Sequence, residues 1–146
     1  MLKEKLSMLH APDFSKSFIL QTDASDQRYG VVLTQKDDNG KEHPILFLSK
    51  KFTATERKYS TTEKECAAIL YAIKKLKGYI DGQTEFYIQR DHNPLVWLKN
   101  NAGNNGRLLR WALALQSFNF TTTHKKGKDS LNVDCLSRNS LHIQTR

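Results

Sequence analysis

An Asn-Gly pair between two apolar runs is the sequence feature that most constrains the fold. The turn Asp38-Asn39-Gly40 separates residues 29–35 from residues 44–49. Two apolar runs joined in this way are the strongest short-range signal for a β-hairpin. The run FILQTD, residues 18–23, predicts one more strand before the hairpin. The fold is therefore expected to begin with three consecutive strands.

Downstream of the hairpin the pattern changes to helices that alternate with single strands. Ser60, Thr61 and Thr62 are candidate caps of a helix that is expected to stop at Gly78, and Asn93 can cap a short helix that begins at Pro94. Further strands are predicted over 84–91 and 118–123, a loop over 100–106, and helices over 107–116 and 130–138. This order predicts an α/β fold with a five-stranded mixed sheet, antiparallel at one edge and parallel where helices cross over.

Size and charge set limits on the organisation and on the partner. A chain of 146 residues matches one domain, expected over 14–140, with a short amphipathic piece over 1–13 that lacks an obvious partner and a tail over 141–146. The formal net charge of +8 favours nucleic acid as partner, although a solvated basic surface remains an alternative. No signal peptide or membrane-spanning run is recognisable, so we expect a cytoplasmic or nuclear location and no membrane partner.

Two aspartates come at the ends of predicted strands. Asp23 ends the first strand and Asp91 ends the fourth, and each is followed at once by turn or cap residues. If these strands are parallel neighbours, both side chains lie beyond the carboxyl ends of the strands, where open α/β sheets bind ligands. The alternative for either residue alone is that it only turns the chain.

Glu65 is the carboxylate that the helical pattern marks most clearly. It falls on the apolar stripe of the helix that starts near residue 60, so we expect it to face the sheet. Glu63 projects from the opposite side and is either a solvent-facing carboxylate or the capping-box partner of Ser60. A capping box between Glu65 and Thr62 is the competing interpretation. A carboxylate on an apolar stripe otherwise needs a cation or a charge partner.

Asp134, in the last predicted helix, completes a set of four acids. Alone it is ordinary compensation of the helix dipole. Carboxylates that lie close together repel one another. A bound Mg²⁺ ion usually offsets this repulsion, because Mg²⁺ prefers carboxylate and water oxygens as ligands. Two such ions can activate a water and stabilise a leaving oxygen in phosphodiester cleavage. Acids clustered in a basic chain therefore suggest hydrolysis of nucleic acid.

Five motifs in order carry a family resemblance. TDAS (22–25), YSTTEKE (59–65), DHNPLVWL (91–98), RLLRWALALQ (107–116) and DCLSR (134–138) closely resemble the ribonuclease H domain of gypsy-type LTR retrotransposon reverse transcriptases. The resemblance spans about residues 13–138. It implies a ribonuclease H-like fold and two Mg²⁺ or Mn²⁺ ions held by Asp23, Glu65, Asp91 and Asp134.

The resemblance also implies an activity and partners. It implies an endonuclease that cuts the RNA strand of RNA/DNA hybrids, with the polymerase domain of the same element directly upstream. Residues 1–13 then look like a remnant of that polymerase or its connection segment. An RNA-directed DNA polymerase activity would belong to the parent polyprotein and not to these residues.

Several positions depart from the family pattern or add to it. Arg90 stands where the family usually has Thr, and strand alternation sends it to the face opposite Asp91, where it alters packing or adds a basic contact. If the strand bulges at this point, Arg90 could instead compete with metal. His124 is a candidate auxiliary group for proton transfer or product release, with a surface histidine at a strand end as the alternative. Basic side chains are candidates for phosphate contacts: Lys74, Lys75, Lys77, Arg107, Arg110, Lys125, Lys126 and Lys128.

Two other functions are compatible with parts of the sequence. A decayed or domesticated copy could keep the fold and the basic surface as a nucleic-acid-binding module that no longer cleaves. A zinc protein that uses His92, His124, Cys66 and Cys135 lacks the expected ligand spacing. We expect both cysteines to be buried small residues.

Overall fold

The computed structural model of the chain describes residues 4–82, 85–90 and 92–123. This part contains six strands and five helices. The strands are β1 (Glu4–Met8), β2 (Ile19–Ala24), β3 (Arg28–Lys36), β4 (Glu42–Lys51), β5 (Phe86–Gln89) and β6 (Phe120–Thr123). The helices are α1 (Ala54–Arg57), α2 (Thr61–Lys75), α3 (Lys77–Ile80), α4 (Pro94–Asn101) and α5 (Gly106–Gln116).

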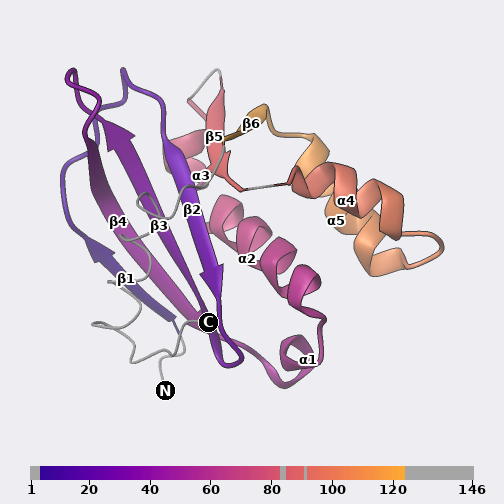
Figure 1. The fold of residues 1–146 in the computed structure, drawn as a ribbon. Helices are drawn as coiled ribbons and strands as arrows, with labels where there is room; N and C mark the ends of the chain where they lie inside the picture. Colours follow the sequence, from indigo (N-terminus) through magenta and orange to yellow (C-terminus); the bar gives the residue numbers. More distant parts are fainter. Residues whose placement is uncertain (1–3, 83–84, 91, 124–146) are drawn as a thin grey trace.

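All six strands belong to one mixed sheet, in the order β1-β4-β3-β2-β5-β6 (Figure 1). The pairs β1 with β4, β4 with β3 and β3 with β2 are antiparallel. β5 runs parallel to β2, and β6 runs parallel to β5. The five predicted strands are thus confirmed as a mixed sheet, antiparallel on one side and parallel where helices form the crossovers.

β1 is a sixth strand that the sequence analysis did not predict. Residues 4–8 pair with residues 46–50 of β4. The expectation that the piece over 1–13 has no partner in the chain is therefore wrong for these residues. β1 joins the sheet through backbone hydrogen bonds to β4, which lies some forty residues away in the chain. Its mixture of Lys, Glu and Leu contains no local pattern that predicts this pairing. The origin of residues 1–13 in a polymerase segment stays a prediction.

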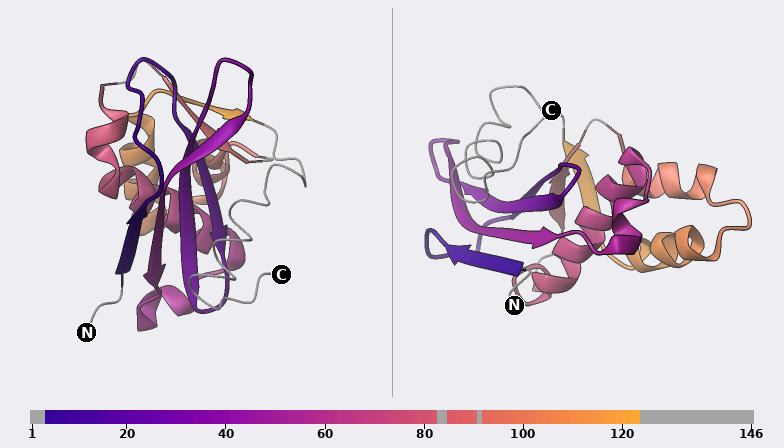
Figure 2. Two further views of the ribbon diagram at one scale, coloured as in Figure 1. Left: turned by 90° about the vertical axis from the view of Figure 1, so that its left-hand side faces the viewer. Right: turned by 90° about the horizontal axis from the view of Figure 1, so that it is seen from below.

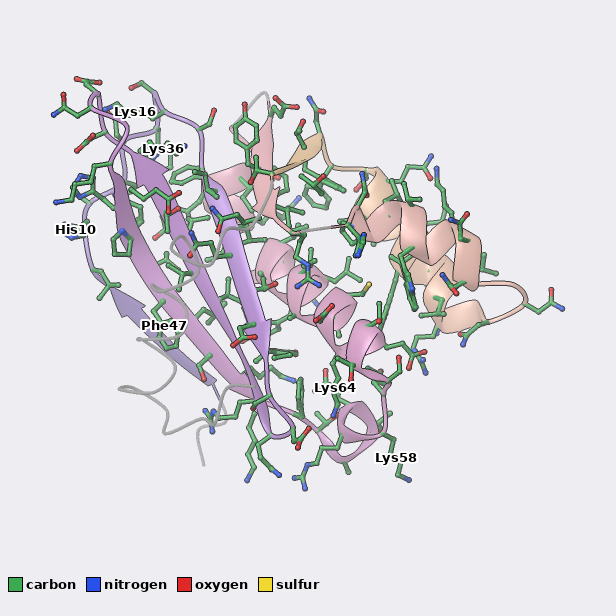
Figure 3. All side chains as sticks on the ribbon, in the orientation of Figure 1. His10, Lys16, Lys36, Phe47, Lys58 and Lys64 are labelled. Carbon is green, nitrogen blue, oxygen red and sulfur yellow. The ribbon has the colours of Figure 1, made fainter. Side chains whose placement is uncertain are left out.

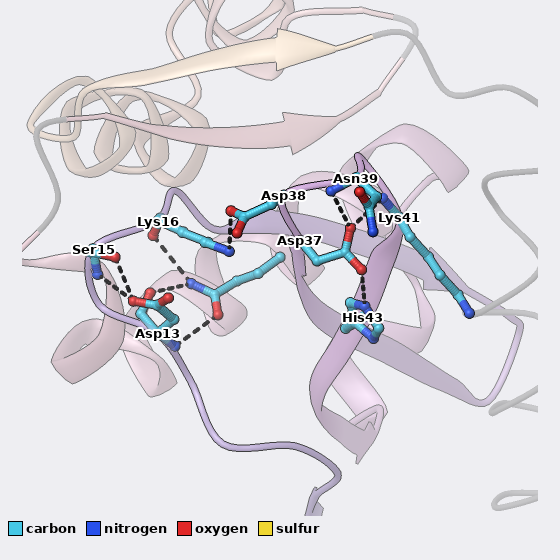
Figure 4. A network of polar contacts seen from close by, with 9 residues as sticks. Asp13, Ser15, Lys16, Asp37, Asp38, Asn39, Lys41 and His43 are labelled. Atoms are coloured by element: carbon cyan, nitrogen blue, oxygen red, sulfur yellow. Dashed lines mark hydrogen bonds and ion pairs between the residues drawn. The ribbon is translucent and has the colours of Figure 1, made fainter.

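The β3–β4 hairpin forms at the predicted turn. Gly40 has a φ of 82°, and the backbone N–H of Asp37 donates to the carbonyl of Lys41 at 2.8 Å. The Asp37 carboxylate accepts hydrogen bonds from the backbone N–H groups of Asn39 and Lys41 and lies 2.7 Å from Nε2 of His43 (Figure 4). The His43 contact is the main reason that the pKa of Asp37 lies below its usual value. These contacts fix the turn.

Capping residues start the helices where the sequence predicted, but α2 ends earlier than expected. Its C-cap is Leu76, and Gly78 lies inside the one-turn helix α3 instead of stopping α2. The buried Leu76 side chain holds the chain against the core at this bend. At α4 the side chain of Asn93 accepts from the N–H of Leu95, as a cap should, with Pro94 in the first turn.

Two departures from the predicted helix boundaries remain. α1 is an unpredicted single turn, and its N-cap residue Thr53 forms a capping box with Glu56. The predicted loop over 100–106 shrinks to 102–105, because α4 extends through Asn101 and α5 begins at Gly106.

The main core lies between the sheet and the helices α2, α4 and α5, which gather on one side of the sheet (Figure 2). Its fully buried side chains include Leu20 and Leu33 from the sheet and Ile69 from α2. A smaller cluster joins Ala24 of β2 to Ala67 and Ala68 of α2. Because these clusters are continuous along α2, the helix is fixed over β2 and β3. In the part of the chain described, no helix combines the length and apolarity of a bilayer span.

Candidate functional site

Asp23 lies near the carboxyl end of β2 and is almost completely buried, with 6% of its surface exposed. Its Cα pairs with that of Gly30 in β3. The chain turns directly after the strand, since the Ser25 hydroxyl accepts hydrogen bonds from the N–H groups of Gln27 and Arg28. The TDAS motif therefore builds a buried carboxylate followed by a side-chain-stabilised turn.

Alternation along β2 shows which face of the sheet carries Asp23. Leu20 and Ala24 belong to the clusters packed under α2, so Asp23 and Gln21 lie on the other face. On that face the side-chain amide of Gln21 donates to Glu42 at 3.1 Å. The amide of Gln89 in β5 reaches the same carboxylate at 3.5 Å. Asp23 thus lies on a polar strip that crosses from β2 to β5.

The condition on which the shared position of Asp23 and Asp91 depends is met, because β2 and β5 are parallel neighbours. Ile19 pairs with Tyr87 and Leu20 with Ile88. Arg90 follows β5 directly, and its N–H donates to the carbonyl of Thr123 in β6 at 2.9 Å. Asp91 itself lies outside the residues that the structure describes, so its place at this edge stays a prediction.

The first turn of α2 settles the roles of the two glutamates that the sequence left open. Ser60 and Glu63 form the capping box: the Ser60 hydroxyl accepts from the N–H of Glu63, and the Glu63 carboxylate accepts from the N–H of Ser60 at 2.9 Å. A capping box between Thr62 and Glu65 is therefore ruled out. Glu65 is left for another role.

Glu65 is half-buried and is bound by Arg90. Nη2 of Arg90 donates to Oε1 of Glu65, and the two side chains are 19% and 25% exposed, respectively. Since Ala67 and Ala68 pack on Ala24, the N-terminal part of α2 lies at the carboxyl end of β2. Asp23 and Glu65 therefore flank the same end of the strand, Asp23 from the sheet and Glu65 from the helix. Arg90 alters the site by a direct contact with Glu65.

Arg107, which the sequence offered as a phosphate contact, is engaged inside the protein. Its guanidinium donates to Oε2 of Glu63 at 2.7 Å and lies 4.4 Å from the ring centroid of Tyr59 and 5.4 Å from that of Trp111. We call these four residues the Arg107 cluster. It ties α5 to the start of α2, which carries Glu65. By contrast, Arg110 on α5 is exposed.

The remaining predicted site residues lie outside the described residues. These are Asp91, Asp134, His124 and the basic residues Lys125, Lys126 and Lys128. Two of the four predicted metal ligands, Asp23 and Glu65, are thus described. Over residues 4–82, 85–90 and 92–123, no three His, Cys, Asp or Glu side chains are grouped to hold a metal ion.

The chemistry of the described groups fits a hard divalent cation. Within the described part of the chain, the side-chain oxygens of Gln21, Thr22 and Gln89 are buried without a hydrogen-bond partner. Gln21 and Gln89 lie on the same face of the sheet as the buried carboxylate of Asp23, whereas alternation puts Thr22 on the face that α2 covers. Carboxylate and amide oxygens therefore share the face that carries Asp23. Such oxygens are what Mg²⁺ prefers. Glu65 already binds a cation, the Arg90 guanidinium.

The described cysteine does not fit a zinc site. Cys66 is buried in the core, as expected, and burial raises the pKa of its thiol to about 12. Among the described residues, Cys66 belongs to no group of three or more His, Cys, Asp or Glu side chains that could hold a metal ion, whereas a structural zinc site needs four ligands. Cys135 lies outside the described residues.

A polar hollow at the opposite end of the sheet is a separate feature. It is lined by His10, Asp13, Lys16 and His43, among others, around the β3–β4 hairpin (Figures 3 and 4). Thr34 at this end of β3 pairs with Ile19, the first residue of β2, whereas Asp23 is near the last. The hollow therefore lies at the end of β2 opposite to Asp23.

Comparison with known proteins agrees with this architecture. The chain resembles Pol polyproteins of retrotransposons: it is 44% identical over 132 residues to the retrovirus-related Pol polyprotein from transposon 412 of Drosophila melanogaster. It is 40% identical over 129 residues to the transposon Tf2-3 polyprotein of Schizosaccharomyces pombe. These matches cover 90% and 86% of the chain and 10% of each polyprotein. The chain thus spans about a tenth of these relatives.

Solved structures show the same fold. The foamy viral protease-reverse transcriptase in complex with dsDNA matches 80% of the chain and 25% of its own length, with a TM-score of 0.64 and 21% identity. Its complex with an RNA/DNA hybrid matches 79% of the chain and 16% of its own length, with a TM-score of 0.59 and 22% identity. Residues 13–118 match the family model described as the RNase H-like domain found in reverse transcriptase. The chain therefore belongs to the family of RNase H-like domains of reverse transcriptases.

Proposed function

We propose that the chain is the ribonuclease H domain of a gypsy-type LTR retrotransposon Pol polyprotein and hydrolyses the RNA strand of RNA/DNA hybrids. The observation that carries the proposal is the buried Asp23 carboxylate at the carboxyl end of β2, next to parallel β5, in a chain of this family. The foamy viral relative that was solved with an RNA/DNA hybrid supports this substrate class. As part of this proposal, we infer that the activity belongs to the cytoplasm or nucleus.

In this proposal Asp23, Glu65, Asp91 and Asp134 hold two Mg²⁺ or Mn²⁺ ions. When bound, the ions supply an activated water and charge stabilisation for the leaving 3′ oxygen, so that the products carry 5′ phosphate and 3′ hydroxyl ends. Burial on the sheet fixes the Asp23 carboxylate before substrate arrives. His124 remains an auxiliary candidate for moving a proton to the leaving group.

Substrate binding depends in this proposal on basic side chains that do not read base identity. Lys58 and Lys64 lie around α1 and the start of α2, at the end of the molecule that carries Glu65 (Figure 3). Contacts to phosphates position a duplex without regard to sequence, which suits an enzyme that must act along any template. The upstream polymerase domain of the same element is the proposed protein partner.

The test is cleavage of a strand-labelled RNA/DNA hybrid by the purified chain, with Mg²⁺ or Mn²⁺ and with EDTA. We expect metal-dependent cutting of the RNA strand alone. Asp23→Asn and Asp91→Asn should abolish it, whereas Asp26→Asn, a matched control at the exposed turn after β2, should keep it. Equal activity in Asp23→Asn and Asp26→Asn would refute the proposal.

A second candidate is a nucleic-acid-binding module without activity. The ion pair between Arg90 and Glu65 favours it, because a predicted metal ligand is already bound to a cation. Hybrid binding without cleavage in either metal would support this candidate. Cleavage that is lost in Asp23→Asn would rule it out.

A further inference from the structure

Arg90 and Glu65 form a shielded ion pair between the end of β5 and the first turns of α2. Nη2 of Arg90 donates to Oε1 of Glu65, and about four-fifths of the Arg90 side chain is withdrawn from solvent. Water and salt screen such a pair less than they screen a fully exposed one. The Arg90 guanidinium therefore neutralises much of the negative charge of Glu65, and a second cation is attracted to this carboxylate less strongly.

The backbone fixes Arg90 in this position. Its N–H donates to the carbonyl of Thr123 in β6 at 2.9 Å, so the residue continues the sheet beyond β5. Alternation from the buried Ile88, which belongs to the core under α2, directs the Arg90 side chain to the same side. The pair thus depends on the sheet register.

The neighbouring acid offers Arg90 no equivalent partner. Glu63, two residues before Glu65, is occupied by the backbone N–H of Ser60 and by Nη2 of Arg107 at 2.7 Å. The start of α2 therefore has two arginines matched to two glutamates. Removing Arg90 leaves Glu65 half-buried with its guanidinium partner gone.

We propose that Arg90 competes with divalent metal for Glu65 and thereby sets the metal requirement of this domain. This inference rests on the proposed function, because it assumes that Glu65 is a metal ligand. A metal ion can bind the Glu65 carboxylate only in those molecules in which the Arg90 guanidinium has moved away from it. If the pair is formed in about nine molecules of ten, the apparent dissociation constant for metal is raised about tenfold. A tenfold change corresponds to about 1.4 kcal/mol.

The test measures metal binding directly, by calorimetric titration of the full chain with Mn²⁺ and with Mg²⁺ in the absence of nucleic acid. Arg90→Gln should bind metal about tenfold more tightly than the unmodified chain. Arg110→Gln is the matched control, since it removes the same charge from an exposed site on α5. In a Glu65→Gln background, Arg90→Gln should no longer tighten metal binding.

Two outcomes overturn the competition. One is an equal affinity of Arg90→Gln and the unmodified chain, and the other is an equal gain in Arg90→Gln and Arg110→Gln, which would reflect net charge alone. Arg90→Lys provides a second variant that keeps the charge but lacks the planar donor fork, and it should show a smaller gain.

A metal-free measurement tests the pair by itself. Urea unfolding in EDTA of Arg90→Gln, Glu65→Gln and the double variant should give a favourable coupling between the two side chains, and zero coupling would overturn the inference. The outcome for the proposed function is separate. Equal metal affinities with RNA cleavage intact refute only the competition. Tight metal binding by Arg90→Gln together with an unmodified chain that never cleaves supports the competition and refutes the proposed function for this chain.

Discussion

Replacing Arg107 by Ala should weaken the contact between α5 and the start of α2. The side chain donates to Oε2 of Glu63 at 2.7 Å and covers the Tyr59 ring at 4.4 Å. The pair is partly exposed, with 31% of the Arg107 side chain and 18% of the Glu63 side chain accessible. We therefore assign about 1 kcal/mol to the ion pair and about 1 kcal/mol to the aromatic contacts, giving a loss of about 2 kcal/mol.

The assays are urea unfolding and thermal unfolding, both monitored by Trp fluorescence and circular dichroism. At this chain length a loss of about 2 kcal/mol should lower the melting temperature by roughly 4–8 °C. Arg107→Lys keeps the charge without the planar fork and should lose about half as much. Arg110→Ala, one turn further along α5 and exposed, should change the free energy of unfolding by less than about 0.5 kcal/mol.

The explanation requires that Arg107 acts through Glu63. Combining Arg107→Ala with Glu63→Gln should cost less than the sum of the two single changes, with a coupling of about 1 kcal/mol. Losses that simply add, or equal losses for Arg107→Ala and Arg110→Ala, would refute the role of the Arg107 cluster as a tie between the two helices.

Three further predictions follow from caps and titratable groups. Ser60→Ala removes the N-cap of α2 and should lower the free energy of unfolding by about 1 kcal/mol in urea titrations; an unchanged midpoint would contradict the capping box. Burial acts to raise the pKa of Glu56, but hydrogen bonds, first of all from the N–H of Thr53, outweigh it and hold the pKa below 4.5. Because this folded-state pKa is lowered, the stabilisation is present above pH 4.5 and is lost as the pH falls through the folded value, so the stability gap between the unmodified chain and Glu56→Gln should narrow in acid. In a Cys135→Ser background, Cys66 should not react with iodoacetamide at pH 8 until urea is added, because burial raises the pKa of its thiol to about 12; rapid labelling of the folded protein would contradict this.

Local signals in the sequence predicted most of the fold. The turn at Asn39-Gly40 and the caps at Ser60 and Asn93 depend on residues close together in the chain, and the structure confirms all three. The capping box of Thr53 with Glu56 had the same kind of local signal and was overlooked. β1 could not be predicted in this way, because its place depends on a distant strand.

The candidate site was predictable in part for the same reason. The position of Glu65 on its helix and the direction of Arg90 follow from the periodicities of a helix and a strand. Their contact joins residues that are 25 positions apart in the chain, and it depends on where the start of α2 lies relative to the end of β5. Arg107 shows the limit most clearly, since its charge suggested a phosphate contact while the fold gives it Glu63 and two aromatic rings as partners.

The pairing of β1 with β4 has a practical consequence for anyone who shortens this chain. The family match begins at residue 13, but a fragment cut there would lose the strand that covers the outer edge of β4. The exposed backbone of β4, with the apolar run 45–48 at its centre, would become a template for pairing with other molecules. Such a fragment should tend to aggregate or to exchange strands between copies. A fragment that keeps residues 4–8 retains β1, which pairs with the outer edge of β4.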